Sequence, residues 1–135
     1  REGDLSMPVS LAEAEGLARE YTAAWNTGRP EAVAAFFAET GGIVINRGPL
    51  WEGRAGVAAM AAGFFADVPD LALQCDGVKL AGSHMLYLWT FTGTHSGTGR
   101  ALRITGWEEW ELGADLLVTA SRGWFDPEEW ARQTR

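Results

Sequence analysis

The acid and base groups best placed for chemistry lie near the end of this 135-residue chain. Glu109 and Arg122 fall on two successive predicted strands, and if both side chains point inward they must pair, because an isolated buried ion is costly. Asp126 follows the second of these strands directly. A carboxyl group whose pKa is set by neighbouring charges suits proton transfer. These three residues are therefore the candidates for acid–base chemistry.

Each candidate also has a purely structural interpretation. Asp126 opens the sequence Asp-Pro-Glu-Glu, which is typical of a helix N-cap followed by a first-turn proline. Asp126 can therefore be a cap, a proton carrier or both, and Glu109 with Arg122 can be a structural ion pair. The remaining acids near these residues are expected to be solvated: Glu108, Glu111, Glu128 and Glu129.

Metal and cofactor chemistry has little support in the sequence. The single cysteine, Cys75, and the two histidines, His84 and His95, do not form a CxxC or HxxxH spacing. Both histidines are expected at the surface. We predict no metal site and no cofactor.

Composition restricts the class of protein. The chain is 47% hydrophobic and carries a net charge of −7, which argues against nucleic-acid binding. It lacks a run of the about 18 to 20 apolar residues that a membrane span needs. No signal peptide is visible after the polar start Arg1–Ser6, so we expect a cytoplasmic protein. Residues 1–9 are interpreted as a disordered arm or an addition to the natural chain, and 10–135 as one domain.

Helical patterns come first in the chain. Ser10 and Glu13 form a capping box with Val9 as its hydrophobic staple, and apolar residues then recur at helical spacing as far as Gly28. A shorter helix is predicted from Pro30. A third helix is predicted from about residue 53 to just before residue 69, after a short β-branched run at 43–45.

The apolar period changes to two after residue 70, which predicts strands at about 71–81, 84–94, 102–112 and 116–125 and then a terminal helical turn carrying Trp130. Helices followed by a strand meander indicate an α+β fold. Both faces of the strands are apolar. We therefore expect a second copy of the chain to cover the outer face, with Trp110 in the dimer interface.

Several segments together resemble the SnoaL-like branch of the nuclear transport factor 2-like superfamily. The resemblance covers residues 11–133 and rests on Tyr21-Thr-Ala-Ala-Trp25-Asn26-Thr-Gly28, Ala34-Ala-Phe36-Phe37-Ala-Glu39, Glu52-Gly53-Arg54, Pro69-Asp70-Leu71, Phe91-Thr-Gly93-Thr-His95-Ser-Gly97 and Trp124-Phe125-Asp126. It implies a cone-shaped α+β domain with N-terminal helices packed on a curved mixed, mostly antiparallel sheet. It also implies an apolar pocket between the layers and a homodimer formed through the outer sheet face.

The chemistries of this superfamily fit the chain unequally. The ketosteroid isomerase branch implies a helix tyrosine, which Tyr21 matches, but Asn46 and Trp107 stand at or next to the positions of its two carboxylic acids. The polyketide cyclase branch implies an acid at Asp126. The epoxide hydrolase branch implies a network that Asn46, Glu109, Arg122 and Asp126 match only in part.

If the register of the family holds, the concave face also collects aromatic and polar side chains that would line the pocket. These are Tyr21, Trp25, Asn46, Trp51, Tyr87, Trp89, Thr105, Trp107 and Trp124. Simple core filling is the alternative for the indoles, and a strand-edge hydrogen bond is the alternative for Asn46. The predicted partner is a hydrophobic small molecule. The predicted function is cofactor-free cyclase or isomerase chemistry on a carbonyl compound, with a non-catalytic binding or dimerisation module as the alternative and an epoxide hydrolase-like activity as the third option.

Overall fold

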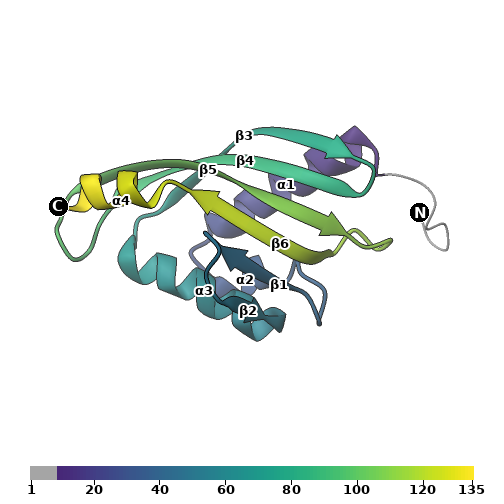
Figure 1. The fold of residues 1–135 in the computed structure, drawn as a ribbon, viewed down its shortest axis with the longest axis horizontal. Coiled ribbons are helices and arrows are strands. Elements are labelled where there is room, and N and C mark those ends of the chain that lie inside the picture. The colour runs from purple at the N-terminus through teal and green to yellow at the C-terminus, as the bar shows by residue number, and fades with distance from the viewer. Residues whose placement is uncertain (1–8) are drawn as a thin grey trace.

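A computed structural model describes residues 9–135 as helices packed on one six-stranded sheet (Figure 1). Residues 1–8 of the predicted arm lie outside the described residues. The helices are α1 (Leu11–Trp25), α2 (Pro30–Ala34), α3 (Gly53–Asp67) and α4 (Pro127–Thr134). The strands are β1 (Gly42–Ile45), β2 (Leu50–Glu52), β3 (Ala72–Ala81), β4 (His84–Thr94), β5 (Ala101–Leu112) and β6 (Val118–Phe125).

The sheet has the order β2-β1-β6-β5-β4-β3, and every neighbouring pair is antiparallel except β1 and β6. Figure 1 shows α4 at one end of the sheet, beside the turn between β4 and β5. The α+β class and the mixed, mostly antiparallel sheet are confirmed.

The start of α1 follows the predicted capping box. The Ser10 hydroxyl accepts from the Glu13 backbone N–H at 3.0 Å, and the Glu13 carboxylate accepts from the Ser10 backbone N–H at 2.9 Å. Val9 is 5% exposed and belongs to the core. The helix then buries one face, including Tyr21 and Trp25, against the sheet.

A tight turn, which we did not predict as a hairpin, joins β1 to β2. Asn46 and Arg47 both have positive φ, at 50° and 60°, and the Gly48 N–H donates to the Ile45 carbonyl at 2.8 Å. This is the geometry of a type I′ hairpin turn, in which asparagine is favoured. The Asn46 carboxamide oxygen also accepts from the Phe125 backbone N–H at 3.0 Å. Asn46 therefore ties the turn to the end of β6.

The register of β5 differs from the expectation. Tyr87 lies opposite Glu108, and Trp89 lies opposite Gly106. Tyr87 and Trp89 are buried as predicted, so their cross-strand partners share the helix-facing side of the sheet, which we call the inner face. The inner row of β5 is Leu102, Ile104, Gly106, Glu108, Trp110 and Leu112.

This register overturns several expectations. Trp110 is 1% exposed in the core, so its placement in a dimer interface was wrong, and the solvated position expected for Glu108 was wrong as well. The inward placement of four other residues was also wrong. The residues Thr105, Trp107, Glu109 and Arg122 belong to the opposite, outer face of β5 and β6.

Gly106 explains why the inner row of β5 contains a position without a side chain. A Cβ atom at this position would lie 2.6 Å from Cζ2 of Trp89, so the large indole occupies the space that a side chain would take. The inner row thus contains a glycine and a glutamate, whereas the outer row contains Trp107. A one-residue change of parity moves a whole row to the other face.

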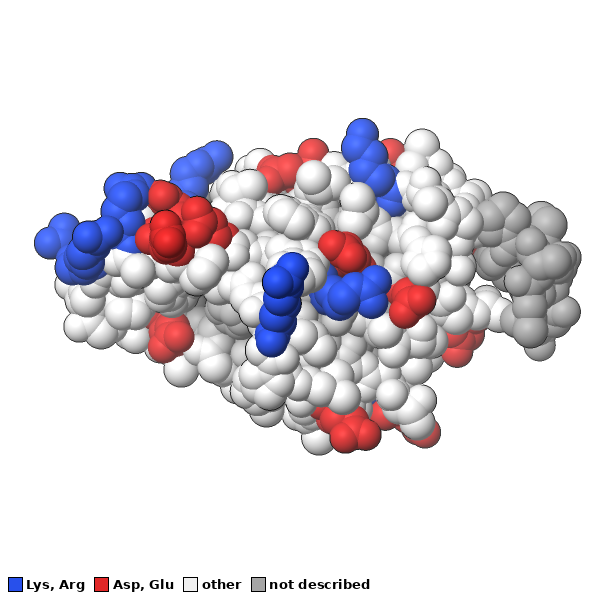
Figure 2. All heavy atoms as spheres, viewed as in Figure 1, with Lys and Arg blue, Asp and Glu red and all other residues white. Residues whose placement is uncertain are grey.

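The outer face exposes apolar side chains, among them Leu86 (36%) and Trp107 (42%). Figure 2 shows one group of charged side chains at the α4 end and a second near the centre of the visible face, with uncharged areas between them. That a second copy covers the outer face stays a prediction. Within residues 9–135, no helix combines the length and the apolar character needed to cross a bilayer.

Candidate functional site

A buried carboxyl group, Glu108, lies where three elements meet on the inner face. Its Oε1 atom accepts from Trp110 Nε1 at 2.9 Å and from the Ser121 hydroxyl at 2.9 Å. The Tyr21 hydroxyl lies 3.1 Å from Oε1 and 3.0 Å from Oε2, to which it donates. One acid thus connects α1, β5 and β6.

Burial sets the proton affinity of this group. Removal of the Glu108 carboxyl from water raises its pKa, although the hydrogen bonds from Trp110, Ser121 and Tyr21 act in the opposite direction. Burial and the charge of Glu108 also raise the pKa of Tyr21 well above its ordinary value. Both shifts favour a neutral pair of side chains. A protonated carboxyl group can donate a hydrogen bond or a proton to a bound oxygen.

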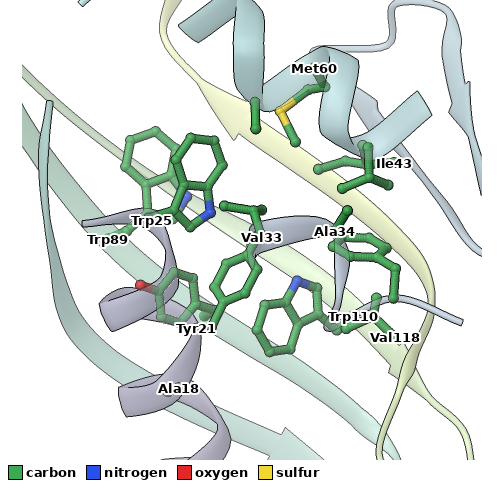
Figure 3. Close-up of a cluster of buried hydrophobic side chains, with 14 of the residues drawn as sticks. Ala18, Tyr21, Trp25, Val33, Ala34, Ile43, Met60, Trp89, Trp110 and Val118 are labelled. Atoms are coloured by element: carbon green, nitrogen blue, oxygen red, sulfur yellow. The ribbon is translucent and has the colours of Figure 1, made fainter. Parts of the chain in front are cut away.

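Glu108 forms part of the wall of a partly enclosed cavity of about 50 Å³ between the helices and the inner face. By the same measure, one water molecule needs about 10–15 Å³. Figure 3 shows Tyr21 and Trp25 from α1, Trp89 from β4 and Trp110 from β5 directed into the region between the two layers. The lining residues are Trp25, Ile43, Ile45, Met60, Phe64, Leu71, Leu73, Trp89, Phe91, Glu108, Gly123, Trp124 and Phe125.

The chemistry of this lining is simple. Glu108 is its one ionisable residue in the part of the chain that the structure describes, and aromatic and aliphatic side chains make up nearly all of the rest. Apolar walls with few polar groups are typical of small-molecule sites. Of the predicted pocket residues, Trp25, Trp89 and Trp124 contribute to the lining. Tyr21 does not line the cavity but donates a hydrogen bond to Glu108, which does.

Tyr87 is buried beside this site but has another partner. Its hydroxyl lies 2.5 Å from Thr22 Oγ1, and Thr22 donates its own proton to the Ala18 carbonyl. Tyr87 must therefore be the donor to Thr22. Burial, the largest influence, raises its pKa. This side chain fixes α1 on β4 and does not line the cavity.

The predicted catalytic set is not brought together. Glu109 and Arg122 do pair, with Arg122 Nε 3.3 Å from Glu109 Oε1, but they do so on the outer face. The indole N–H of Trp107 donates to Glu109 Oε2 at 3.1 Å. This bond and the Arg122 guanidinium lower the pKa of Glu109, which favours a charged carboxylate.

Asp126 is the N-cap of α4, and its carboxylate accepts from the Glu128 backbone N–H at 2.9 Å. The capping interpretation is confirmed. Asp126 is exposed and is not among the residues that line the cavity. The same holds for Trp51, which is 37% exposed on β2, and for Thr105, which meets Thr90 on the outer face.

Glu108 is the residue that the sequence reasoning missed. The signal was present: Glu108 shares its parity with Ile104, Trp110 and Leu112. A carboxylate in an otherwise apolar row of one strand is a candidate buried acid. As for metals, residues 9–135 contain no group of three or more His, Cys, Asp or Glu side chains arranged to hold an ion.

Comparisons with known proteins assign the chain to a family. The family model of the SnoaL-like domain matches residues 18–120. A search of curated protein sequences finds no match. Solved structures match the fold at low identity.

Three similar structures illustrate this. A Catenulispora acidiphila protein with a ketosteroid isomerase-like fold, in complex with trimethylamine, is 18% identical with a TM-score of 0.80, covering 87% of this chain and 91% of its own. AclR, a putative hydroxylase from Streptomyces galilaeus, is 20% identical with a TM-score of 0.79 and coverage of 93% and 97%. A putative SnoaL-like polyketide cyclase from Jannaschia is 16% identical with a TM-score of 0.76 and coverage of 93% and 96%. At these identities the likeness shows the fold alone.

Proposed function

Because the chain belongs to the SnoaL-like domain family, we propose that it binds a hydrophobic carbonyl compound and carries out cofactor-free acid–base chemistry of the cyclase or isomerase type. Glu108 takes the role of proton carrier. The observation that carries the proposal is the position of this carboxyl group in the wall of an apolar cavity, where burial raises its pKa. This assignment replaces Asp126 as the acid, since Asp126 is an exposed helix cap.

The chemistry that fits one buried acid is enolisation. The carboxylic acid of Glu108 donates its proton to the carbonyl oxygen, and the resulting carboxylate takes a proton from the adjacent carbon. The products are an enol and a protonated Glu108, so the group returns to its starting state. Enolisation begins both double-bond migration and aldol-type ring closure. Tyr21, Trp110 and Ser121 would hold the carboxyl in place and stabilise its charged form through their hydrogen bonds.

A non-catalytic binding module is the second candidate. It is favoured by the presence of a single ionisable group in the lining, because acid–base enzymes commonly use two groups of different pKa. Aromatic walls with one carboxylate also suit a methylated ammonium ion, and one protein of similar fold is in complex with trimethylamine. Trimethylamine is therefore a useful second probe.

The decisive experiment follows exchange of the methyl protons of acetophenone in D₂O by NMR. Wild-type protein should accelerate the exchange, and Glu108→Gln should reduce the acceleration by about 100-fold or more, in line with the usual size of general acid–base catalysis. The matched control is Glu109→Gln, which changes the adjacent carboxylate on the outer face and should leave the rate unchanged. Equal rates for wild type and Glu108→Gln would remove Glu108 from the mechanism. Binding of acetophenone or trimethylamine without exchange would favour the binding module.

A further inference from the structure

Two buried indoles on the inner side of the molecule differ in their hydrogen bonding. Trp110 is 1% exposed and its N–H donates to Glu108. Trp25 is 7% exposed, and its N–H has no hydrogen-bond partner among residues 9–135. Trp25 lines the cavity, whereas Trp110 does not.

A buried donor without an acceptor is costly, and most buried polar groups in proteins are paired. Phenylalanine at position 25 would supply an apolar ring without this cost. The N–H of Trp25 is therefore a polar group for which the fold itself provides no use, placed in the wall that also holds the Glu108 carboxyl.

The Tyr21 hydroxyl is not a hydrogen-bond acceptor for the Trp25 N–H. It lies close enough to Trp25 for the indole N–H to lower the Tyr21 pKa, which is a minor influence beside burial, but no hydrogen bond of acceptable geometry joins them.

The Trp25 ring is held firmly in its orientation. It packs edge-on against Phe65 with ring centroids 5.4 Å apart, against Phe64 at 6.2 Å and against Tyr21 at 6.4 Å. Contacts on several sides restrict the ring to one rotamer, so little entropy would be lost when its N–H meets an acceptor.

We propose that the indole N–H of Trp25 orients the ligand by donating to its oxygen, and that the ligand is an uncharged, flat compound with a carbonyl-type acceptor on an apolar body. The proposal rests on the proposed function, in which the same oxygen receives the proton of Glu108. The aromatic lining residues Trp89, Phe64 and Phe91 suit the flat body. A carbonyl oxygen has two lone pairs and can accept from both groups.

Acetophenone and ethylbenzene test this assignment, because they have nearly the same shape and only the ketone can accept a hydrogen bond. In ¹⁵N-labelled protein, acetophenone should shift the Trp25 indole N–H resonance downfield, and ethylbenzene should not. The variant Trp25→Phe identifies that resonance among the seven tryptophans. It should also weaken acetophenone binding about 3- to 10-fold, the usual range for one hydrogen bond, and leave ethylbenzene binding unchanged.

Thermal unfolding without ligand supplies a readout that a structural role would change. Trp25→Phe loses buried ring volume but no hydrogen bond, so its melting temperature should fall only slightly below that of wild type. The matched variant Trp110→Phe should melt lower, because it removes a donor that Glu108 uses. A fall for Trp25→Phe as large as that for Trp110→Phe would mean that the Trp25 N–H has a structural partner and would overturn the proposal.

The binding measurements can also contradict the proposal. Equal affinity of wild type and Trp25→Phe for acetophenone, equal affinity of wild type for both probes, or binding of neither probe would overturn the role of Trp25. Failure of the proposed function is distinguishable from these outcomes. If Glu108→Gln exchanges protons as fast as wild type while the affinity pattern holds, the enolisation fails and the ligand assignment stands.

Discussion

Glu108 and Glu109 are adjacent in the chain, yet they lie on opposite faces of the sheet and respond to opposite forces. Glu108 is 6% exposed and accepts hydrogen bonds from three buried side chains, but desolvation is stronger and raises its pKa. Glu109 lies at the surface, where the Trp107 N–H and Arg122 lower its pKa. The same side chain is therefore favoured as a neutral acid on one face and as a charged ion-pair partner on the other.

The difference shows what the cavity adds to a carboxyl group. Each acid has an indole N–H donor two residues away on the same strand, so hydrogen bonding to an indole does not by itself distinguish the two acids. The two acids differ in their access to water. A buried carboxyl group stays protonated, and so keeps a proton available for a ligand, because its charged form is destabilised, whereas Glu109 keeps both its charge and its hydration.

The largest expected effect comes from the indoles beside the two acids. Trp110→Ala removes a side chain that is 1% exposed and should lower the free energy of unfolding by about 3–5 kcal/mol. Trp107→Ala, on the outer face at 42% exposure, should change it by less than about 1 kcal/mol. Urea unfolding of both variants measures the contrast. Similar losses would mean that the outer face is covered, which would support the predicted second copy.

Replacement of the buried acid should have the next largest effect. Glu108→Leu leaves the donors of Tyr21, Trp110 and Ser121 without their acceptor, at a cost of about 1–3 kcal/mol for a buried unpaired group. Glu108→Gln resembles the neutral acid in shape and hydrogen bonding and should cost less than about 1 kcal/mol near pH 5. Chemical denaturation compares the two variants at that pH. A Gln variant as unstable as the Leu variant would contradict a neutral Glu108.

The pH dependence of stability should separate Glu108 from the other acids. Because its pKa is raised in the folded state, Glu108 adds stability below its unfolded pKa and this contribution is lost as the pH rises through the folded pKa. The free energy of unfolding of wild type minus that of Glu108→Gln should therefore fall with rising pH above about 4.5, by at most about 1.4 kcal/mol per pH unit. Denaturation series from pH 4 to 9 give the difference. A difference that rises with pH would show that the carboxylate form is favoured.

The sequence was sufficient for the fold but not for the site, and β5 shows why. The capping box at Ser10, the proline starts of α2 and α4 and the strand periods depend on local preferences that act over a few residues. The face that each β5 residue takes depends on pairing with β4, where Trp89 fills the space above Gly106. That packing is not a property of β5 alone, and the register taken from the family resemblance gave residues 105–109 the wrong parity. Asp126 was placed correctly as a cap because capping is local.

The smallest expected effect is on the outer face, and it provides the sharpest test of the comparison between the two acids. Glu109→Gln removes a carboxylate that is about one-third exposed and paired with Arg122, and water screens such pairs, so the change in unfolding free energy should stay within about 0.5 kcal/mol. The sign of its pH dependence is opposite to that of Glu108: with a lowered folded pKa, Glu109 adds stability above its unfolded pKa, and this contribution is lost as the pH falls through the folded value. The effect should also shrink at 1 M salt, where the Debye length is about 3 Å, while that of Glu108→Gln should change little because the carboxyl is buried. Unfolding of both variants at low and high salt measures this, and an equal salt response at the two positions would mean that burial does not distinguish the two acids.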